Sequence, residues 1–442
     1  PCVVTVRGPS GVGKSMLVRE LQRPVMQRRG IFVHGRFEQG RGSQAQEAIF
    51  VALREVVKQT LAAPPERIAS LGEQLRRALG GGLAVLAEFL PELVHLVGDV
   101  GVVTVVPPAE SRHRFRLAVS AFLGVFARPG RPLVLFIDDV QWADASSLEL
   151  LEWLVTAQGA PHLLLVLGAR RGVVEGDGGE GDVASLEAAL ARLELGEIAV
   201  RRIELAPFDE AHTTRLIAEV LHRGAEETIE VARLIHERTR GNPFDICDAL
   251  VALEEAGTLR FDHRLARWVW TLEDLRRWGI DDDVQHRLAT RFAAMAASTR
   301  EVLLAAACLG SHFDLETLGA AAGSSGGPLA AALGEAEAAG LVMKDGEDGG
   351  WTFVHDRLQR AVLDSCPAGE LPTVHARLAL GMRARLGVEA LERALPLLAQ
   401  QITAGASVLV KDDVPERVAL VEILLSAARR LRRALSFGPA AW

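Results

Sequence analysis

Short apolar runs alternate with longer amphipathic stretches in the N-terminal half of the chain. The runs with strand character are CVVTV (2–6), GIFVHGRFEQ (30–39), PLVLFIDD (132–139), HLLLVLGAR (162–170) and AVRRIEL (199–205). Between them, apolar residues recur at helical spacing over 14–29, 44–62, 66–99, 111–127 and 146–157. Strands that alternate with helices in this order predict an α/β domain with a parallel sheet and helices on both faces.

The C-terminal half of the chain has a different pattern, in which helical spacing predominates. The helical stretches are 209–256, 283–309, 327–340 and 370–438. A small hairpin is predicted at 258–270, and the pair LVMKDG (341–346) and WTFVH (351–355) has the character of two adjacent strands. Helices followed by such a two-stranded wing indicate a winged-helix domain.

A glycine-rich loop joins the first predicted strand to the first predicted helix. VRGPSGVGKS (6–15) fits the pattern G-x-x-x-x-G-K-[ST], in the strand–loop–helix context that this phosphate-binding motif requires. Backbone N–H groups of such a loop converge on phosphate oxygens, and the helix adds its positive N-terminal end. We expect Lys14 to reach the β- and γ-phosphates and Ser15 to ligate Mg²⁺. The other nucleotide-binding residues predicted here are Gly8, Ser10, Gly11, Gly13 and Met16.

Two carboxylates end the apolar run at 132–139. Asp138 should emerge at the C-terminal edge of the sheet, where ligands bind in open α/β folds, and hold Mg²⁺ together with Ser15. Asp139 is a candidate for orienting or activating the attacking water. The alternative is that Asp139 only caps the next helix, since aspartate is a favoured N-cap. The chain has no N-K-x-D pattern for guanine, so ATP is expected rather than GTP.

These patterns predict a chain of four parts. They are a P-loop nucleotide-binding domain (1–205), a helical lid with the small hairpin (206–282), a winged-helix domain (283–366) and a helical region (367–442) expected to begin a helical-repeat sensor domain.

Composition narrows the range of partners and compartments. The 442 residues carry a net charge of −8, which argues against a broad nucleic-acid surface. The cysteines, at positions 2, 247, 308 and 366, lack metal-site or C-x-x-C spacing, so we expect free thiols in the reducing cytoplasm. No apolar run approaches the ~18–20 residues of a membrane helix, and no leader is apparent. The abrupt ends at Pro1 and Trp442 suggest a fragment of a longer protein.

Several motifs together resemble one class of ATPase. FIDDVQWADASSLELL (136–151) resembles the Walker B segment of STAND ATPases, which are signal-transducing, AAA+-related proteins with several domains. The branch in question lies within large signalling proteins that carry a Ser/Thr kinase-like domain before the ATPase and sensor and histidine-kinase domains after it. Further stretches that resemble this branch, in the same order, are HGRFEQ (34–39), ESRHRF (110–115), TRGNPF (239–244) and FVHDRLQRAV (353–362).

The resemblance implies roles for residues outside the phosphate loop. In STAND proteins a G-x-P motif in the lid packs its proline near the adenine, and Gly241 and Pro243 match it. A winged-helix histidine of this class often contacts the β-phosphate of ADP, and His355 matches that residue; by itself, a lone histidine at a strand end is usually structural. Gly241 would also end a helix in the left-handed conformation, with Pro243 preventing its continuation.

The chain departs from the STAND pattern in two places. Where the family has Tyr-Arg-Asp-Asn-Glu after the sensor strand, this chain has Arg170-Arg171-Gly172-Val173-Val174. Arg171 is therefore favoured as the γ-phosphate sensor, with Arg170 the alternative and a pair of solvated charges the simpler interpretation. The Pro-Tyr pair that often follows HGRFEQ is replaced within GRGSQAQ (40–46), and the chain contains no tyrosine.

The leading functional hypothesis is a slowly hydrolysing ATPase switch. It would couple the ATP or ADP state to domain rearrangement, to self-association, and to control of attached or partner kinase and sensor domains. One alternative is a STAND-type transcription regulator, because Arg260, His263, Arg264 and Arg267 make the predicted hairpin basic, although such stretches are usually solvated. An oligomeric AAA+ motor and a scaffold with an inactive nucleotide site are the remaining alternatives.

Overall fold

The computed structural model describes residues 1–37, 47–101, 108–156, 160–170, 183–196, 198–277, 291–345, 350–367, 369–409 and 418–427. The chain divides into two compact units, and each is described by itself. The first unit is Pro1–Pro207 and the second is Phe208–Arg430.

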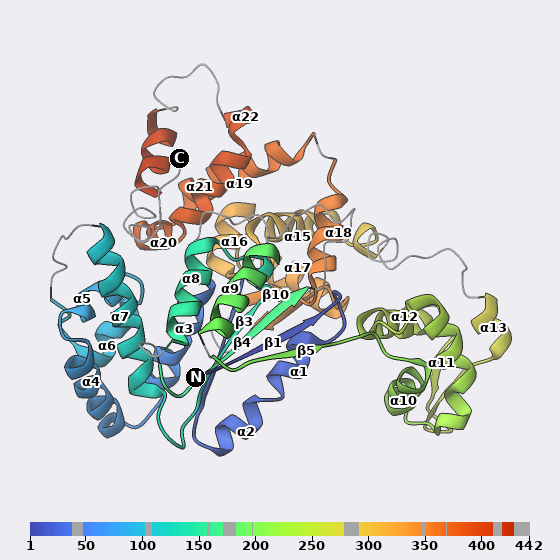
Figure 1. The fold of residues 1–442 in the computed structure, drawn as a ribbon. Coiled ribbons are helices and arrows are strands. Elements are labelled where there is room, and N and C mark those ends of the chain that lie inside the picture. The colour runs from blue at the N-terminus through green and yellow to red at the C-terminus, as the bar shows by residue number, and fades with distance from the viewer. Residues whose placement is uncertain are drawn as a thin grey trace. The chain divides into compact units, whose positions relative to one another are not determined.

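A parallel sheet forms the centre of the first unit (Figure 1). Its strands are β1 (Cys2–Gly8), β2 (Ile31–Arg36), β3 (Leu133–Asp138), β4 (Leu163–Arg170) and β5 (Val200–Glu204). The order across the sheet is β2-β3-β4-β1-β5, and all neighbouring strands are parallel. The predicted α/β class is confirmed, and the order places the C-terminal ends of β2, β3, β4 and β1 along one edge.

Helices cover both faces of this sheet. On one face lie α1 (Lys14–Arg19) and α2 (Gln22–Gln27), over a small core that includes Val18, Val25, Val134 and Phe136. The opposite face is covered by α3 (Glu47–Leu61), α7 (Pro108–Phe126), α8 (Ala145–Leu154) and α9 (Val183–Leu195). All six residues of β3 are buried, because alternate side chains enter the two cores.

Additional helices, from 3 to 15 residues long, extend the larger core beyond the sheet. They are α4 (Pro65–Leu79), α5 (Gly82–Ala87), the 3₁₀ helix η1 (Pro91–Leu93) and α6 (Val94–Val97). Phe50, Phe89 and Phe115 pack together there, with the rings of Phe50 and Phe89 stacked at 4.6 Å. This packing accounts for the helical pattern predicted over 66–99.

The second unit begins with a helical bundle and a hairpin. Its elements are α10 (Glu210–Leu221), α11 (Ala225–Thr239), α12 (Pro243–Glu255), β6 (Arg260–Asp262), β7 (Arg267–Val269) and α13 (Leu272–Arg277). Ile217, Val231, Ile235, Ile246 and Leu253 form the centre of its core. The antiparallel pairing of β6 with β7 confirms the hairpin predicted at 258–270.

A second group of helices packs on a small antiparallel sheet. Its elements are α15 (Ala297–Leu309), β8 (His312–Phe313), α16 (Leu315–Ala322), α17 (Gly327–Ala338), β9 (Val342–Asp345) and β10 (Gly350–Phe353). The sheet order is β8-β10-β9, so β8 adds a third strand to the predicted pair.

The described residues after β10 are mostly helical. They form α18 (Asp356–Asp364), α19 (Leu371–Arg385), α20 (Val388–Arg393), α21 (Leu395–Ala404), α22 (Ala406–Leu409) and a helical stretch at 418–427. The buried Gln401 ties this region to α15, because its Nε2 donates to the Cys308 carbonyl at 2.9 Å while its Oε1 contacts His375 Nδ1 at 2.7 Å.

Candidate functional site

The glycine-rich loop lies between the end of β1 and the start of α1. Gly11 (φ 82°) and Gly13 (φ 95°) adopt the left-handed conformation, which glycine tolerates best. Gly8 is required for a different reason, since a Cβ there would lie 2.6 Å from the Leu205 carbonyl oxygen. The loop therefore has its tight course because these positions carry no side chain.

Lys14 lies against this loop at the first position of α1. It is only 8% exposed, and its Nζ donates to the carbonyl oxygens of Gly8 at 3.1 Å and Pro9 at 3.0 Å. These contacts hold the ammonium group against the loop in which a phosphate would be cradled. Met16, two residues later, is 67% exposed.

Ser15 meets the first carboxylate of β3. Its Oγ donates a hydrogen bond to Asp138 Oδ2, so two residues 123 positions apart in the sequence share one site. Asp138 is 5% exposed, and its burial, followed by the nearby charge of Asp139, raises the pKa of its carboxyl. Gly168 on β4 provides the space, since a Cβ there would lie 2.3 Å from Asp138 Oδ1.

Asp139 is held by groups from two other segments. Arg36 at the end of β2 places both Nε and Nη2 2.8 Å from Asp139 Oδ2, and Gln141 Nε2 donates to Oδ1 at 2.8 Å. Burial acts to raise the pKa of Asp139, but the charges of Arg36 and Arg170 outweigh it and lower that pKa. The pKa values of the two adjacent carboxyls are therefore shifted in opposite directions.

The helix-cap alternative for Asp139 is not what the structure shows. Helix α8 is capped by Asp144, whose Oδ1 accepts from the Ser147 N–H at 3.0 Å. Asp139 (φ 53°) precedes the 3₁₀ helix η2 (Val140–Trp142) without capping it through its side chain. Its carboxylate is committed to the charged network instead.

Of the two arginines considered as sensor, Arg170 belongs to this network. Its backbone N–H donates to Gln141 Oε1 at 3.2 Å, and its Nε lies 3.8 Å from Asp139 Oδ1. The favoured candidate, Arg171, lies outside the described residues and remains a prediction.

Three members of the site are not among the residues predicted from the sequence: Arg36, Gln141 and Gly168. Each lies inside a predicted strand or the Walker B segment, but nothing in the sequence indicates that β2 and β4 are the two neighbours of β3. The basic side chain of Arg36 within the predicted strand at 30–39 is the one signal that could have indicated it.

Gly241 and Pro243 lie in the second unit, at the turn between α11 and α12. Gly241 (φ 76°) approaches Phe208 so closely that a Cβ would lie 1.8 Å from the Phe208 carbonyl oxygen. Asn242 caps α12 by accepting from the Phe244 N–H at 3.1 Å, and Pro243 is the first residue of that helix. The predicted left-handed Gly241 is confirmed, and Pro243 begins the next helix rather than merely ending the previous one.

His355 also lies in the second unit, where it caps α18. Its Nδ1 accepts from the Arg357 N–H at 3.1 Å, and its ring packs on Phe244 with 4.2 Å between centroids. The structure thus brings together two motifs, TRGNPF and FVHDR, that are more than 100 residues apart in the sequence. Their contact with nucleotide remains a prediction.

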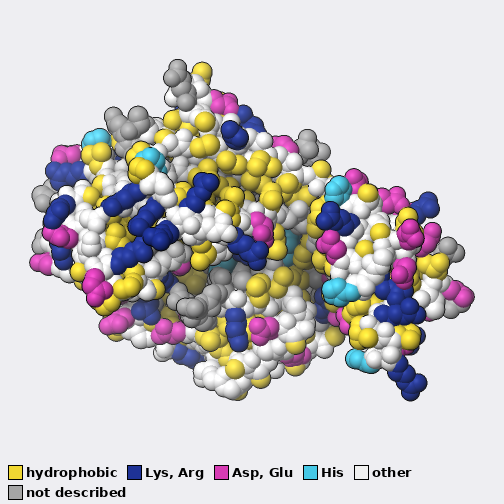
Figure 2. Space-filling model, turned by 90° about the horizontal axis from the view of Figure 1, so that it is seen from below, with side chains coloured by type: hydrophobic (Ala, Val, Ile, Leu, Met, Phe, Trp, Pro, Cys, Tyr) yellow, Lys and Arg dark blue, Asp and Glu magenta, His cyan; other side chains and the backbone are white. Residues whose placement is uncertain are grey.

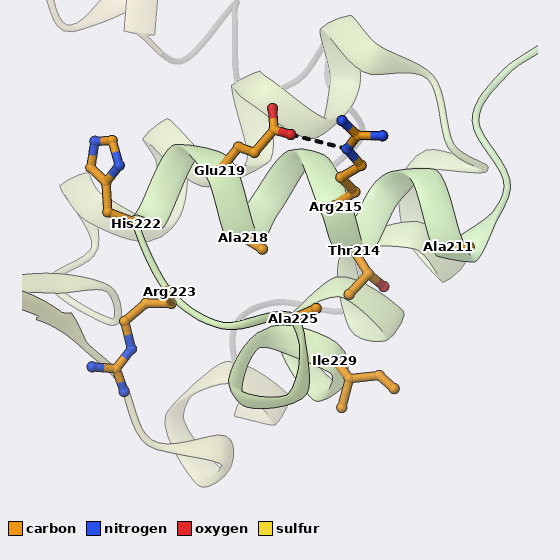
Figure 3. Close-up of a pocket in the computed structure, with 9 residues that line it drawn as sticks. All are labelled: Ala211, Thr214, Arg215, Ala218, Glu219, His222, Arg223, Ala225 and Ile229. Carbon is orange, nitrogen blue, oxygen red and sulfur yellow. Dashed lines mark hydrogen bonds and ion pairs between the residues drawn. The ribbon is translucent and has the colours of Figure 1, made fainter.

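A groove of about 840 Å³ lies on α10 and α11 (Figure 3). The ion pair between Arg215 Nε and Glu219 Oε1, at 3.0 Å, lies along it. None of the predicted site residues line this groove. The lining residues are Ala211, Thr214, Arg215, Ala218, Glu219, His222, Arg223, Ala225 and Ile229.

Comparisons with known proteins agree with the geometry of the first unit. The family described as the AAA ATPase domain matches residues 1–166. A curated relative, the hybrid signal transduction histidine kinase G of Dictyostelium discoideum, is 25% identical in an alignment of 377 residues that covers 71% of this chain. The chain spans only 11% of that relative's length. The family match supports an AAA-type ATPase domain at residues 1–166, as the phosphate loop and the Walker B segment predict.

Three solved structures are similar at low sequence identity. A STAND protein with a tetratricopeptide repeat sensor from Pyrococcus horikoshii is 14% identical, with a TM-score of 0.48, over 98% of this chain and 51% of its own. The ORC2 protein of Aeropyrum pernix in its ADP form is 12% identical, with a TM-score of 0.33, over 86% of this chain and 88% of its own. Cdc6p of Pyrobaculum aerophilum is 12% identical, with a TM-score of 0.34, over 82% of this chain and 87% of its own. All three TM-scores are below 0.5, so a functional assignment depends on the residues of this chain.

Proposed function

We propose that the first unit binds ATP or ADP with Mg²⁺ and hydrolyses ATP slowly. The observation that supports this most strongly is the hydrogen bond between Ser15 and Asp138, directly beside a loop whose lysine is held close to its carbonyl groups. A hydroxyl and a carboxylate are the hard oxygen ligands that Mg²⁺ prefers. The nucleotide phosphates would be cradled by the backbone N–H groups of the loop and by Lys14.

The metal requirement fits this arrangement. Mg²⁺ is usually held by one or two protein groups together with substrate phosphates and water, rather than by an all-protein cage. Ser15 and Asp138 would supply those two groups, and no cluster of three or more His, Cys, Asp or Glu side chains suited to a metal occurs in the part of the chain that the structure describes. When bound, the ion neutralises charge that develops on the phosphate oxygens.

Asp139 is proposed as the group that orients and deprotonates the attacking water. Its lowered pKa keeps it ionised, which a proton acceptor requires. Arg36 and Gln141 nevertheless occupy both of its carboxylate oxygens. A water must compete with these donors for the remaining acceptor capacity of Asp139, and this restraint supports slow, regulated turnover rather than a fast motor.

The second unit is proposed to read the nucleotide state. Pro243 would lie near the adenine, and His355 would contact the β-phosphate of ADP, so that exchange of ADP for ATP releases the contact and shifts the domain arrangement. The order α15, β8, α16, α17, β9, β10 supports a winged-helix domain as the part that carries His355. The proposed output is self-association and control of attached kinase or sensor domains.

The DNA-binding alternative has less support from the structure. Arg260, Arg264 and Arg267 are exposed on the β6–β7 hairpin, but Asp262 lies among them. Figure 2 shows that the region of α10–α13, at the right of the view, carries side chains of both charges and histidines. This surface is not the single-sign basic face expected of a nucleic-acid-binding domain.

The described residues also contain no helix that is both long and apolar enough to span a membrane.

Two substitutions test the proposal, with nucleotide affinity measured by calorimetry and ADP release by stopped-flow fluorescence. Lys14→Ala should abolish measurable nucleotide binding, while Lys58→Ala, on α3, serves as a matched surface control. His355→Ala should leave ADP binding detectable but accelerate its release. Unchanged affinity in the Lys14 variant would refute the site, and unchanged release in the His355 variant would refute the switch.

A further inference from the structure

Two residues at the start of α12 contact the start of α18. Phe244 packs on the ring of His355, and Asp245 Oδ1 accepts from Arg357 Nη1 at 2.6 Å. The members of each trio, Pro243-Phe244-Asp245 and His355-Asp356-Arg357, are adjacent in the sequence. The turn that carries the predicted adenine-proximal proline is therefore joined to the segment that carries the predicted phosphate-contacting histidine.

The N-cap of α18 determines which ring nitrogen of His355 can donate. Nδ1 accepts the backbone N–H of Arg357, so in the neutral imidazole the proton resides on Nε2. An Nε2–H group is a donor, as a phosphate oxygen requires. The ring is also held against Phe244, at an interplanar angle of 32°, which restricts the direction in which Nε2 points.

The ion pair between Asp245 and Arg357 holds the first turn of α18 against α12. The side chain of Asp245 is 14% exposed and that of Arg357 is 31% exposed, so water screens this pair less than a fully exposed one. Asp245 also lies in the first turn of α12, where a negative charge is favoured by the helix dipole. Arg357 thus donates its backbone N–H to His355 and its guanidinium N–H to α12.

We propose that Phe244, Asp245 and Arg357 are positioning residues that present His355 as an Nε2–H donor to the nucleotide. This inference depends on the proposed contact between His355 and ADP. None of the three residues contacts nucleotide itself; each acts through the ring of His355. When the ion pair is lost, the first turn of α18 and the ring become free to move, and bound ADP is released faster.

A charge exchange tests this proposal in the full 442-residue chain, with release of a fluorescent ADP analogue as the readout. Asp245→Arg and Arg357→Asp should each accelerate release roughly 5–30-fold, the range that corresponds to one or two kcal/mol. The double exchange should restore release to within about threefold, because the pair is rebuilt with opposite polarity. Single-variant rates equal to wild type, or a double exchange as fast as either single variant, would overturn the proposal.

Further variants separate this proposal from the one on which it depends. If His355→Ala releases ADP at the wild-type rate, the nucleotide contact itself fails; if only the ion-pair variants do so, the positioning role alone fails. Phe244→Leu keeps an apolar side chain and guards against misfolding, and it should still accelerate release. Nitrogen-15 NMR of labelled histidines, with the His355 signal identified by its loss in His355→Asn, should show the Nε2–H tautomer. An Nδ1–H tautomer would contradict the proposal.

Discussion

The nucleotide site of the first unit and the α12–α18 junction of the second unit are built in different ways. In the first unit, functional groups from β2, β3, β4 and the loop after β1 converge on one sheet edge, and several have no local structural role. In the second unit, each residue of interest also shapes the local backbone, since Gly241 makes a turn, Asn242 and His355 cap helices, and Pro243 begins one. In the second unit, experiments must therefore separate a functional role from a structural one, whereas in the first unit the two are less closely combined.

The largest expected effect is on ATP turnover and concerns Asp139, whose side chain caps no helix. Asp139→Asn keeps the shape of the side chain but cannot accept a proton, so ATP turnover should fall by about 10²–10⁴-fold while nucleotide affinity changes little. Asp144→Asn is the matched control, because Asn caps a helix as well as Asp and should leave turnover intact. Single-turnover hydrolysis and nucleotide titration measure the two quantities. Equal turnover in both variants would mean that Asp139 has only a structural role.

The next effect tests how strictly the second unit depends on local structure. Gly241→Ala should lower the free energy of unfolding by about 3 kcal/mol or more, because a left-handed backbone and a contact with the Phe208 carbonyl oxygen both oppose a Cβ. Gly257→Ala measures the cost of the left-handed backbone alone, because Gly257 has φ 68° but no atom within 4 Å of its Cβ position. Its free energy of unfolding should fall by about 1–2 kcal/mol. Urea denaturation followed by circular dichroism distinguishes the two. Equal losses would show that the close approach at Gly241 does not constrain the turn.

A smaller effect tests the charge balance of the first unit. Because the pKa of Asp138 is raised in the folded state, its contribution to stability is fully present below the unfolded pKa of about 3.9 and is lost as pH rises through the folded value. Asp138→Asn removes that titration. In the absence of nucleotide and Mg²⁺ the variant should therefore become more stable relative to wild type as pH rises above the unfolded pKa of about 3.9.

Asp139→Asn should change the pH dependence of stability in the opposite direction, because the pKa of Asp139 is lowered. The pKa of Asp139 is lowered, so its ionised form stabilises the fold above the unfolded pKa, and that contribution is lost as pH falls through the folded value. The variant should be less stable than wild type at neutral pH, with the difference shrinking toward acid. Urea midpoints measured between about pH 2 and pH 8 cover the titration of both carboxyls, and parallel pH profiles would contradict the opposite pKa shifts of Asp138 and Asp139.

Local patterns were enough to predict most elements of the fold. Apolar spacing predicted the five strands of the large sheet, the β6–β7 hairpin and the helical region after β10. The spacing differs between a strand or helix that is buried on one face and one that is buried on both. The sequence also indicated Lys14, Ser15, Asp138 and Asp139, because a phosphate loop and a strand-terminal carboxylate pair have recognisable local signatures. Strand order, the third strand β8 and the partners of Asp139 had no such signature.

The chemistry of the phosphate loop is a property of the sequence, since glycines, a lysine and a hydroxyl at that spacing produce it wherever a strand and a helix flank them. The state of the two carboxylates is a property of the tertiary structure. Asp138 and Asp139 are identical side chains at adjacent positions, yet burial raises the pKa of the first while Arg36 and Arg170 lower that of the second. Those arginines reach Asp139 from β2 and β4 only because the sheet places both strands beside β3. Likewise, the ring of His355 lies between the start of α18 and Phe244, a contact with a residue more than 100 positions away that only the fold provides.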